Sequence, residues 1–352
     1  MSAAVVAALA LVAAGCSSSS SSSTTANTTS TAGSACKAGS QSSNVAGLPG
    51  FQVCLFAAAS TKMNHPDDIQ VLGSNVWIGW QNQSAKDGST SVTSTIAEYS
   101  TGGKLLKTWS VIGHADGLHM NPTTNMMWVT ANEDAKPRLY IINPASSTVT
   151  TITVPPLPQG GGLDDFRFFN GAAYISASNP TLNSAGLNTA PAILKVTVSG
   201  STAQVSSAFK ANAKVSTLSP PVMPVTLNLT DADSQTIDPQ GDLVLNSQAD
   251  QELIFIHAIG TSSQTAHVLS VGAQVDDTVW PTSTNGCMLV ADNASGVYSI
   301  CSSIWVPGTP IVDAANDGTT ISFVGTLSLG SGQITPIIVG MNNPHGMGFI
   351  PK

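Results

Sequence analysis

The segment HADGLHMNPTTNMMWVTAN, residues 114–132, is one of six related stretches that divide most of the chain into comparable units. The other five are HPDDIQVLGSNVWIGWQN (65–82), GLDDFRFFNGAAYISASN (162–179), DADSQTIDPQGDLVLNSQ (231–248), QVDDTVWPTSTNGCMLVADN (274–293) and NPHGMGFIPK (343–352). The third residues of successive copies lie 43 to 69 residues apart. Repetition at a period of this size is typical of repeat architectures, so the repeat decides the fold.

Each full copy has the pattern of a β-hairpin. An alternating strand is followed by a turn that carries Gly or Asn and by a second strand that is richer in apolar residues. Two further strands follow in the better copies, for example residues 94–100 and 105–113 after the first copy. No segment shows a helical period of useful length. Four strands per unit predict an all-β protein, a six-bladed β-propeller over residues 49–352, with five or seven blades as open alternatives.

The last copy ends at Lys352 after a single strand, so other segments have to complete its blade. The candidates are residues 51–59 near the start of the domain, residues 320–330 and residues 334–341. Joining the two ends of the domain in one blade would close the ring without leaving an exposed strand edge.

The repeated pattern of a turn, an acidic residue and a second apolar strand resembles the NHL-repeat and regucalcin/gluconolactonase group of six-bladed propellers. The resemblance covers residues 50–352 at the level of architecture. It implies a fold and no particular function. Enzymes of that group carry a glutamate at the start of the first blade, in a metal site that Asn and Asp complete. This chain has no glutamate before Glu98. It also lacks a Gly-x-Ser-x-Gly elbow, a dinucleotide fingerprint and a phosphate loop.

Composition narrows the classes of partner. Only 9% of the 352 residues are charged, and the formal net charge is −8 with 12 Lys plus Arg. Recognition of nucleic acid needs a basic surface, so we expect no nucleic-acid partner. A cationic ligand or a metal ion fits this negative net charge better.

The N-terminus predicts export. Residues 1–15 form a short apolar segment, and Ala13-Ala14-Gly15-Cys16 resembles a bacterial lipobox, in which Cys16 is lipidated. An ordinary cleaved signal is the alternative. Residues 16–48 are rich in Ser and Thr and predict a disordered tether. We therefore expect a protein of the periplasm or cell surface that contacts the membrane only through its lipid anchor.

Four cysteines remain once Cys16 is set aside, and an even number in an exported chain suggests disulfides. Cys287 and Cys301 lie symmetrically about the turn at residues 293–296. In an antiparallel hairpin they would face one another, so we predict a Cys287–Cys301 bond. Cys36–Cys54 then follows by elimination.

The third residue of each copy should form a ring around the mouth of the propeller channel. Its members are Asp67, Asp116, Asp164, Asp233, Asp276 and His345. The partner positions at the other end of each hairpin, candidates for ligand binding, are Asn82, Asn132, Asn179, Gln248 and Asp292. We predict that a subset of the ring binds one divalent cation. Carboxylate and carboxamide oxygens favour Ca²⁺, and a site that also includes a histidine favours Zn²⁺ or Mn²⁺. We expect no nucleotide or organic cofactor. In the alternative, purely structural interpretation, each Asp accepts hydrogen bonds from backbone N–H groups of its own turn or of the next blade.

Histidines break the symmetry of the repeat. His345 replaces Asp in the last copy, and His65 and His114 precede the ring position in the first two copies. These three come from adjacent blades and are the candidate catalytic bases. His119 is assigned to packing or to the rim. The neighbours Asp164-Asp165 and Asp276-Asp277 should face opposite sides of a strand and so should not form acid/base pairs.

These patterns favour a monomeric, lipid-anchored binding module whose acidic channel mouth binds a divalent cation and a small ligand. Two alternatives stay open: a metal-dependent hydrolase or lyase of the lactonase type, and a structural protein of the cell envelope or of adhesion. The sequence does not decide whether the protein is an enzyme, although it argues more against an enzyme than for one. The sequence names no substrate or ligand.

Overall fold

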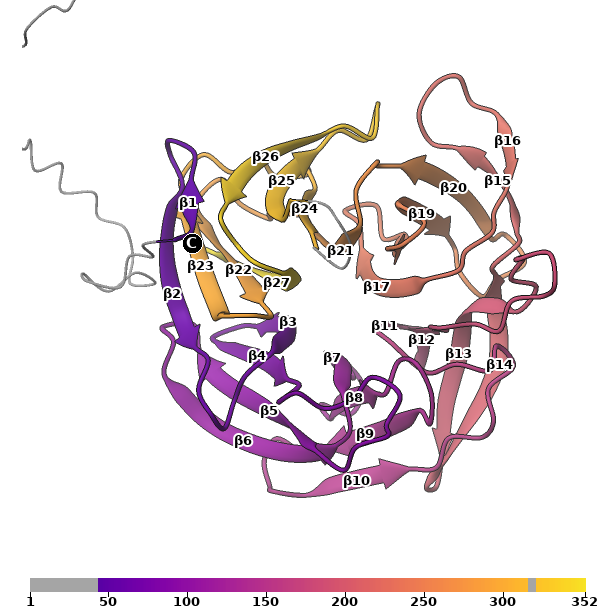
Figure 1. The fold of residues 1–352 in the computed structure, drawn as a ribbon, viewed down its shortest axis with the longest axis horizontal. Coiled ribbons are helices and arrows are strands. Elements are labelled where there is room, and N and C mark those ends of the chain that lie inside the picture. Colours follow the sequence, from indigo (N-terminus) through magenta and orange to yellow (C-terminus); the bar gives the residue numbers. More distant parts are fainter. Residues whose placement is uncertain (1–43, 316–320) are drawn as a thin grey trace, which may run out of the picture. The chain divides into compact units, whose positions relative to one another are not determined.

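The computed structural model describes residues 44–315 and 321–352, and these residues form a six-bladed β-propeller (Figure 1). This confirms the predicted fold class and blade number. The blades follow one another around the ring in chain order, and the innermost strands are neighbours around the channel. Within the described residues we find no helix that is long and apolar enough to cross a membrane.

The first three blades are each built from four consecutive antiparallel strands. Blade 1 contains β3 (Pro66–Leu72), β4 (Asn75–Trp80), β5 (Thr93–Ser100) and β6 (Leu105–Ile112). Blade 2 contains β7 (Ala115–Met120), β8 (Met127–Ala131), β9 (Arg138–Ile142) and β10 (Val149–Ile152). Blade 3 contains β11 (Phe166–Phe169), β12 (Ala172–Ser176), β13 (Pro191–Ser199) and β14 (Thr202–Lys210).

Blades 4 and 5 keep this four-stranded plan and add strands at the outer edge. Blade 4 contains β17 (Ala232–Ile237), β18 (Leu243–Ser247), β19 (Glu252–His257) and β20 (Thr265–Ser270), extended by β15 (Lys214–Thr217) and β16 (Pro224–Thr226). Blade 5 contains β21 (Val275–Val279), β24 (Ile311–Ala314), β25 (Phe323–Leu327) and β26 (Ile334–Val339), extended by β1 (Ala46–Gly47).

Blade 6 closes the ring with strands from three separate parts of the chain. It contains β27 (Pro344–Pro351), β22 (Gly286–Asp292), β23 (Gly296–Ser302) and β2 (Gln52–Ala58). The predicted contribution of residues 51–59 is confirmed, since β2 is the outer strand. Residues 320–330 and 334–341, the other candidates for this blade, instead contain β25 and β26 of blade 5.

The fifth copy of the repeat does not fold as one hairpin, which corrects the sequence analysis. Its first strand β21 pairs with β24, and its second strand β22 crosses to blade 6 and pairs with β27. The seven residues of β22 are all buried, as the second strand of a blade must be when both of its faces pack on neighbouring blades. Asp292 therefore lies opposite Pro344 and not at the end of a hairpin that starts at Asp276.

The core is divided among the blade interfaces. Each of the six hydrophobic clusters joins the facing sides of two adjacent blades. In the cluster between blades 1 and 2, for example, Trp77 and Trp109 of blade 1 stack with ring centroids 4.9 Å apart and share the core with Leu118 and Met127 of blade 2. The interfaces hold the inner strands at fixed positions around the channel, and these strands carry the repeated acidic residues.

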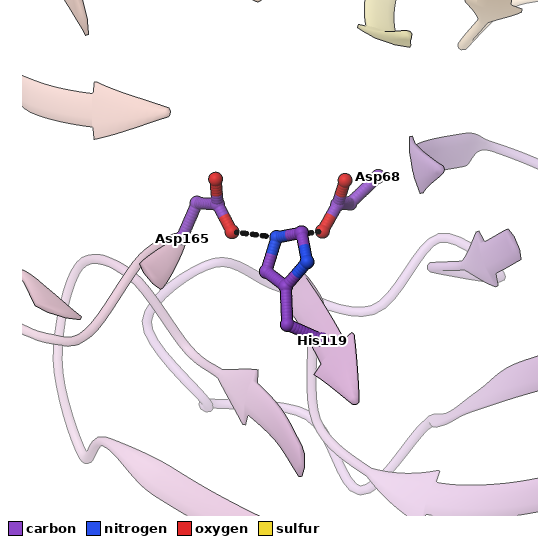
Figure 2. Close-up of side chains that lie close together, drawn as sticks. All are labelled: Asp68, His119 and Asp165. Carbon is purple, nitrogen blue, oxygen red and sulfur yellow. Dashed lines mark hydrogen bonds and ion pairs between the residues drawn. The ribbon is translucent and has the colours of Figure 1, made fainter. Parts of the chain in front are cut away.

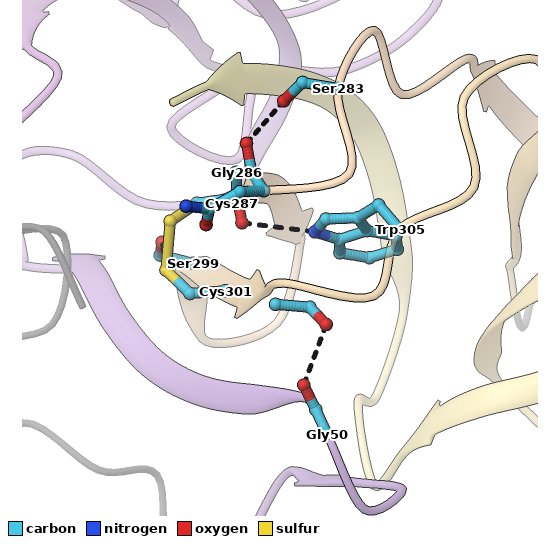
Figure 3. Close-up of a disulfide and its surroundings, with 9 residues drawn as sticks. Gly50, Ser283, Gly286, Cys287, Ser299, Cys301 and Trp305 are labelled. Carbon is cyan, nitrogen blue, oxygen red and sulfur yellow. Dashed lines mark hydrogen bonds between the residues drawn. A yellow bond between two sulfur atoms is a disulfide. The ribbon is translucent and has the colours of Figure 1, made fainter. Parts of the chain in front are cut away.

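The predicted Cys287–Cys301 disulfide is present and joins directly opposed residues of β22 and β23, with Cα atoms 4.0 Å apart (Figure 3). The indole N–H of Trp305 donates to the carbonyl of Gly286 beside it, at 3.1 Å. A buried structural disulfide indicates an oxidising, extracytoplasmic compartment. Cys16 and Cys36 lie outside the described residues, so lipidation and the Cys36–Cys54 bond stay predictions.

Candidate functional site

The inner strands of five blades carry a β-bulge at the repeated acidic position. In β3, for example, the register jumps between Pro66 and Ile69, so that two residues oppose one on β4, and β7, β17, β21 and β27 are interrupted in the same way. A bulge turns consecutive side chains away from strict alternation. Both residues of the pairs Asp67-Asp68 and Asp164-Asp165 line one axial cavity. For Asp164-Asp165 our expectation of opposite faces was wrong, because both residues precede β11 and line the cavity, whereas of Asp276-Asp277 only Asp276 lines it.

The second residue of each pair, the position of Asp68, links a blade to the next one in every other blade of the ring. Asp68, in blade 1, accepts the backbone N–H of Leu118 in blade 2 at 2.6 Å. The same bond joins Asp165 to Gln235 at 2.9 Å and Asp277 to Met347 at 2.5 Å. In the even blades this position holds Gly117, Ser234 and Gly346. The structural role expected for the ring carboxylates is thus carried by Asp68, Asp165 and Asp277.

The ring itself faces the axial cavity, which has a volume of about 340 Å³. All six predicted ring members line it: Asp67, Asp116, Asp164, Asp233, Asp276 and His345. Burial, followed by the repulsion of neighbouring carboxylates, raises the pKa values of Asp116, Asp164 and Asp233 well above the usual range. Taking charged oxygens out of water is costly without a counter-charge, so this ring favours protons or a bound cation.

His345 supplies a positive charge on one side of the ring. Its Nδ1 atom lies 2.6 Å from Asp276 Oδ2 and 3.2 Å from Asp67 Oδ1. Burial opposes the charged imidazole, but Asp276 and Asp67 together raise the pKa of His345 well above its usual value. Nε2 lies 2.7 Å from the amide nitrogen Nδ2 of Asn343, which can only donate in this contact. Both nitrogens of His345 are therefore engaged, Nδ1 by the two carboxylates and Nε2 by the Asn343 amide.

His114 presents the opposite arrangement. Its Nδ1 atom lies 2.8 Å from the carbonyl oxygen of Ser84, which can only accept a proton, so Nδ1 carries the hydrogen. Nε2 is then unprotonated, buried and without a hydrogen-bond partner. Burial lowers the pKa of His114, consistent with a neutral ring. A lone pair fixed in this way is what a metal ligand requires.

Two carboxylates lie beside this nitrogen. His114 Nε2 is 3.5 Å from Asp116 Oδ1 and 3.9 Å from Glu133 Oε1. The second oxygen of Asp116 is buried and has no hydrogen-bond partner. One ligand atom from each of these residues falls within 4.8 Å of the others, which is close enough for a single metal ion. Lys86 lies 2.7 Å from the same oxygen of Glu133.

His65 also lines the axial cavity, so the three histidines of blades 6, 1 and 2 do share it. His65 Nδ1 lies 2.8 Å from Asn293 Oδ1, and the residue has a left-handed backbone, with φ of 52°. The three rings are thus held by different partners, and in the described part of the chain His114 alone among them has a buried ring nitrogen without a hydrogen-bond partner.

The predicted carboxamide partners separate into two groups. Asn82, Asn132 and Asn179 have positive φ angles of 53°, 69° and 46°, a conformation that Asn tolerates well. Their amides bond to the backbone: Asn132, for example, accepts the N–H of His114 at 3.0 Å and donates to the carbonyl of Lys136 at 2.9 Å. Asn82 and Asn132 are not among the residues lining the axial cavity, whereas Gln248 is, and Gln248 donates to Asp276 Oδ2 at 3.2 Å.

Asp292 lies in blade 6, away from the ring. Its carboxylate accepts the backbone N–H groups of Asn343 at 2.9 Å and Asn342 at 3.2 Å, and the hydroxyl of Ser295 at 2.6 Å. These hydrogen bonds fix the backbone just before β27 begins. Asp292 was predicted to be the hairpin partner of Asp276 only because β22 was assigned to blade 5.

Sequence reasoning missed three residues of the mouth. Gln81 donates to Asp67 Oδ2 at 2.8 Å and lies 3.3 Å from Asp116 Oδ1, so it bridges blades 1 and 2. Lys86 comes from the loop between β4 and β5, and Glu133 follows β8. Glu133 and Lys86 had no repeat signal, because they lie in loops that only one copy contains.

A second cluster lies below the mouth, where Asp68, His119 and Asp165 point toward one another from three blades (Figure 2). His119 Nε2 is 2.9 Å from Asp165 Oδ1 and 3.5 Å from Asp68 Oδ2. The spacing of donor atoms fits a metal ion, but the guanidinium of Arg167 already contacts His119 Nε2 and lies 2.6 Å from Asp165 Oδ2. Burial and Arg167 lower the pKa of His119 to about 4. We therefore interpret this cluster as a network of ion pairs at the floor of the cavity. His119 belongs to this network and not to the rim.

No family model matches the chain, and no curated protein matches it. Solved structures of similar fold include the periplasmic gluconolactonase of Pseudomonas aeruginosa, at 10% identity and a TM-score of 0.41, covering 81% of this chain and 88% of that one. Virginiamycin B lyase of Staphylococcus aureus shows 12% identity and a TM-score of 0.41, covering 74% and 95%. A protein of unknown function from Bacteroides caccae shows 8% identity and a TM-score of 0.45, covering 87% and 89%. Similarity at this level says nothing about activity.

Proposed function

We propose that the chain is an extracytoplasmic binding module that holds one divalent cation in its channel mouth and uses it to bind a small ligand. The observation that carries the proposal is His114 Nε2, a buried lone pair without a hydrogen-bond partner. Its imidazole is oriented by the Ser84 carbonyl, and two carboxylates flank the free nitrogen. A buried polar atom that is left without a partner is costly unless an ion or a water completes it.

His114, Asp116 and Glu133 would be the protein ligands. Donor atoms that are 3.5 Å and 3.9 Å apart can share an ion at bond lengths of about 2.0–2.2 Å. One imidazole with two carboxylates suits Zn²⁺ or Mn²⁺ better than Ca²⁺, which prefers six to eight oxygens. Three protein ligands leave a coordination position open to the cavity, where the ligand would bind.

The electrostatics of the mouth support a cation. The pKa of Asp116 is raised well above its usual value by burial and by Glu133, so the apo site holds a proton there. A cation would displace this proton, and its affinity should therefore increase as the pH rises. His345 has no free nitrogen and would act as a fixed charge that balances Asp276 and Asp67.

We further propose that the protein is a monomer held at the membrane surface through lipidated Cys16. Support comes from the sequence of residues 13–16 and from the disulfide, which is consistent with export.

The test is metal analysis of the full chain after chelation and reloading with Zn²⁺, Mn²⁺ or Ca²⁺. We expect about one ion per chain, lost in His114→Ala and in Glu133→Gln. His257→Ala is the matched control, because His257 is an exposed histidine that pairs with Asp242 outside the cavity. A wild-type chain that retains no ion after all three metals are supplied would defeat the proposal and leave a structural envelope role.

A metal-dependent hydrolase or lyase is the second candidate, and one observation favours it. His345 lines the same cavity as the cation ligands, and Asp276 and Asp67 raise its pKa well above the usual value, so it is a candidate general acid. Turnover of simple lactones by the metal-loaded chain, lost in His345→Gln with metal content unchanged, would establish this function. Metal binding without turnover would support the binding module.

A further inference from the structure

The two halves of the channel mouth differ in charge. Blades 6, 1 and 2 contribute His345, His65 and His114 together with Lys86. Blades 3 and 4 contribute Asp164 and Asp233, with no Lys, Arg or His among the residues that line the axial cavity on that side in the described chain. Eight carboxyl groups line the cavity in all. One divalent cation on the histidine side would therefore leave the carboxyl groups of the other half without a cationic partner.

Asp164 has an oxygen that nothing in the fold satisfies. Its side chain is 4% exposed and its Oδ1 atom accepts the backbone N–H of Asp165 at 2.7 Å. Oδ2 is buried and has no hydrogen-bond partner. Because Asp164 lines the cavity, this oxygen is available to a donor that enters from the mouth. A buried carboxylate with one unsatisfied oxygen is best completed by a charged N–H donor.

A second cavity of about 440 Å³ continues from this half of the mouth. It shares Asp233, Gln248, Glu133 and Lys86 with the axial cavity. Its remaining lining is polar and includes Asp231 and Asn179. A ligand that reaches from one cavity into the other therefore meets carboxyl groups and carboxamides along its length, which outnumber the single ammonium group of Lys86, and an anionic ligand would be disfavoured.

We propose that the ligand of the mouth is an organic cation with a primary ammonium group that binds against Asp164 and Asp233, its aliphatic or hydroxylated body extending into the second cavity. The ammonium supplies the N–H donors that Asp164 Oδ2 lacks, and its positive charge offsets the carboxylates of blades 3 and 4. This inference rests on the proposed function only in assuming that the mouth binds a ligand. The ammonium site itself uses no residue of the proposed cation site.

The experiment is calorimetric titration of the full chain with 1,4-diaminobutane, with 1,4-butanediol and succinate as neutral and anionic probes of similar length. Each is measured with and without prior chelation of metal. We expect the diamine to bind at least tenfold more tightly than the diol, and succinate not to bind. Asp164→Asn and Asp233→Asn should each weaken diamine binding by about tenfold or more, since either change removes one of the two counter-charges.

Asp238→Asn is the matched control. It removes the same charge directly after the strand that carries Asp233, but at the turn into β18, outside both cavities. Diamine binding should be unchanged in this variant. It should also persist in His114→Ala, which separates this inference from the cation proposal. The inference is overturned if the diamine does not bind, if the diol binds as tightly, or if the two variants leave its affinity unchanged. It is also overturned if a second equivalent of metal binds and is lost in Asp164→Asn and Asp233→Asn.

Discussion

Single residues at the bulge decide how closely adjacent blades approach. Gly117 occupies the second position of the pair in blade 2, and a Cβ atom there would lie 2.6 Å from Asp165 Cα and 2.8 Å from its Oδ1. Gly346 is equally crowded, at 2.2 Å from the Asp67 carbonyl oxygen. These glycines are required for close approach and not for a turn. The alternation of Asp with small residues around the ring follows from this, because the carboxylate of one blade needs the space that its neighbour leaves.

We predict that Gly117→Ala lowers the free energy of unfolding by about 1–3 kcal/mol, since the methyl group overpacks against backbone that cannot move freely. Urea unfolding checks this. Gly330→Ala is the control, because a Cβ atom at Gly330 meets nothing within 4 Å, and its effect should stay within about 0.5 kcal/mol. Equal effects of the two substitutions would contradict the assignment of Gly117 to a blade contact.

At the level of elements, the unusual feature is the β22–β23 hairpin. It leaves blade 5 after β21, forms the middle of blade 6, and returns to blade 5 at β24. Blade 6 is thus assembled from β2, β22–β23 and β27, which are widely separated in the chain. Its formation depends on long-range pairing, which carries a high entropic cost. The Cys287–Cys301 bond ties together the central hairpin on which β2 and β27 are then added.

Replacing both cysteines, Cys287→Ala with Cys301→Ala, should lower the free energy of unfolding by about 3 kcal/mol, the value expected for a closed loop of about 15 residues. The measurement is denaturant unfolding under non-reducing conditions, with reduced wild-type protein as the reference. The contribution of the bond would be refuted if the double variant were as stable as the oxidised wild type. Metal content should not change, since the hairpin's disulfide lies outside the proposed cation site.

The whole molecule concentrates buried acid around one axis. Burial and the neighbouring Asp165 raise the pKa of Asp277 to about 8, although Arg167 opposes the shift. His345 also has a raised pKa because of Asp276 and Asp67. Both groups bind a proton in the folded state over a pH range in which the unfolded chain has released it. The ring is therefore stabilised by protons when no cation is present.

The sign of the pH dependence follows from linkage. Between pH 6.5 and 8 the native state holds more protons than the unfolded state, so the free energy of unfolding falls as the pH rises, by at most about 1.4 kcal/mol per pH unit for each proton. Chelator-treated protein should show this decline in urea titrations at several pH values. Asp277→Asn, which mimics the protonated acid, should make the decline shallower. A stability that rises with pH over this interval would contradict the assignment.

Periodicity and residue type determined much of this protein from sequence alone. Alternating strands, turns and a recurring acidic residue indicate six blades, the ring of Asp67 to His345 and the Cys287–Cys301 pair. These features are local, or repeat a local signal, and so they can be predicted without knowing which strands meet.

The tertiary structure alone decided the rest. The crossing of β22 to blade 6 depends on which buried neighbour completes each sheet, and this separated Asp292 from its predicted partner position beside Asp276. The bulge in β3 brought Asp68 to the axial cavity, and Asp165, just before β11, lines the same cavity against the expected alternation. Glu133, Lys86 and the free nitrogen of His114 became a site only through contacts between different blades. Such contacts are set by packing across interfaces, for which the linear sequence carries no periodic signal.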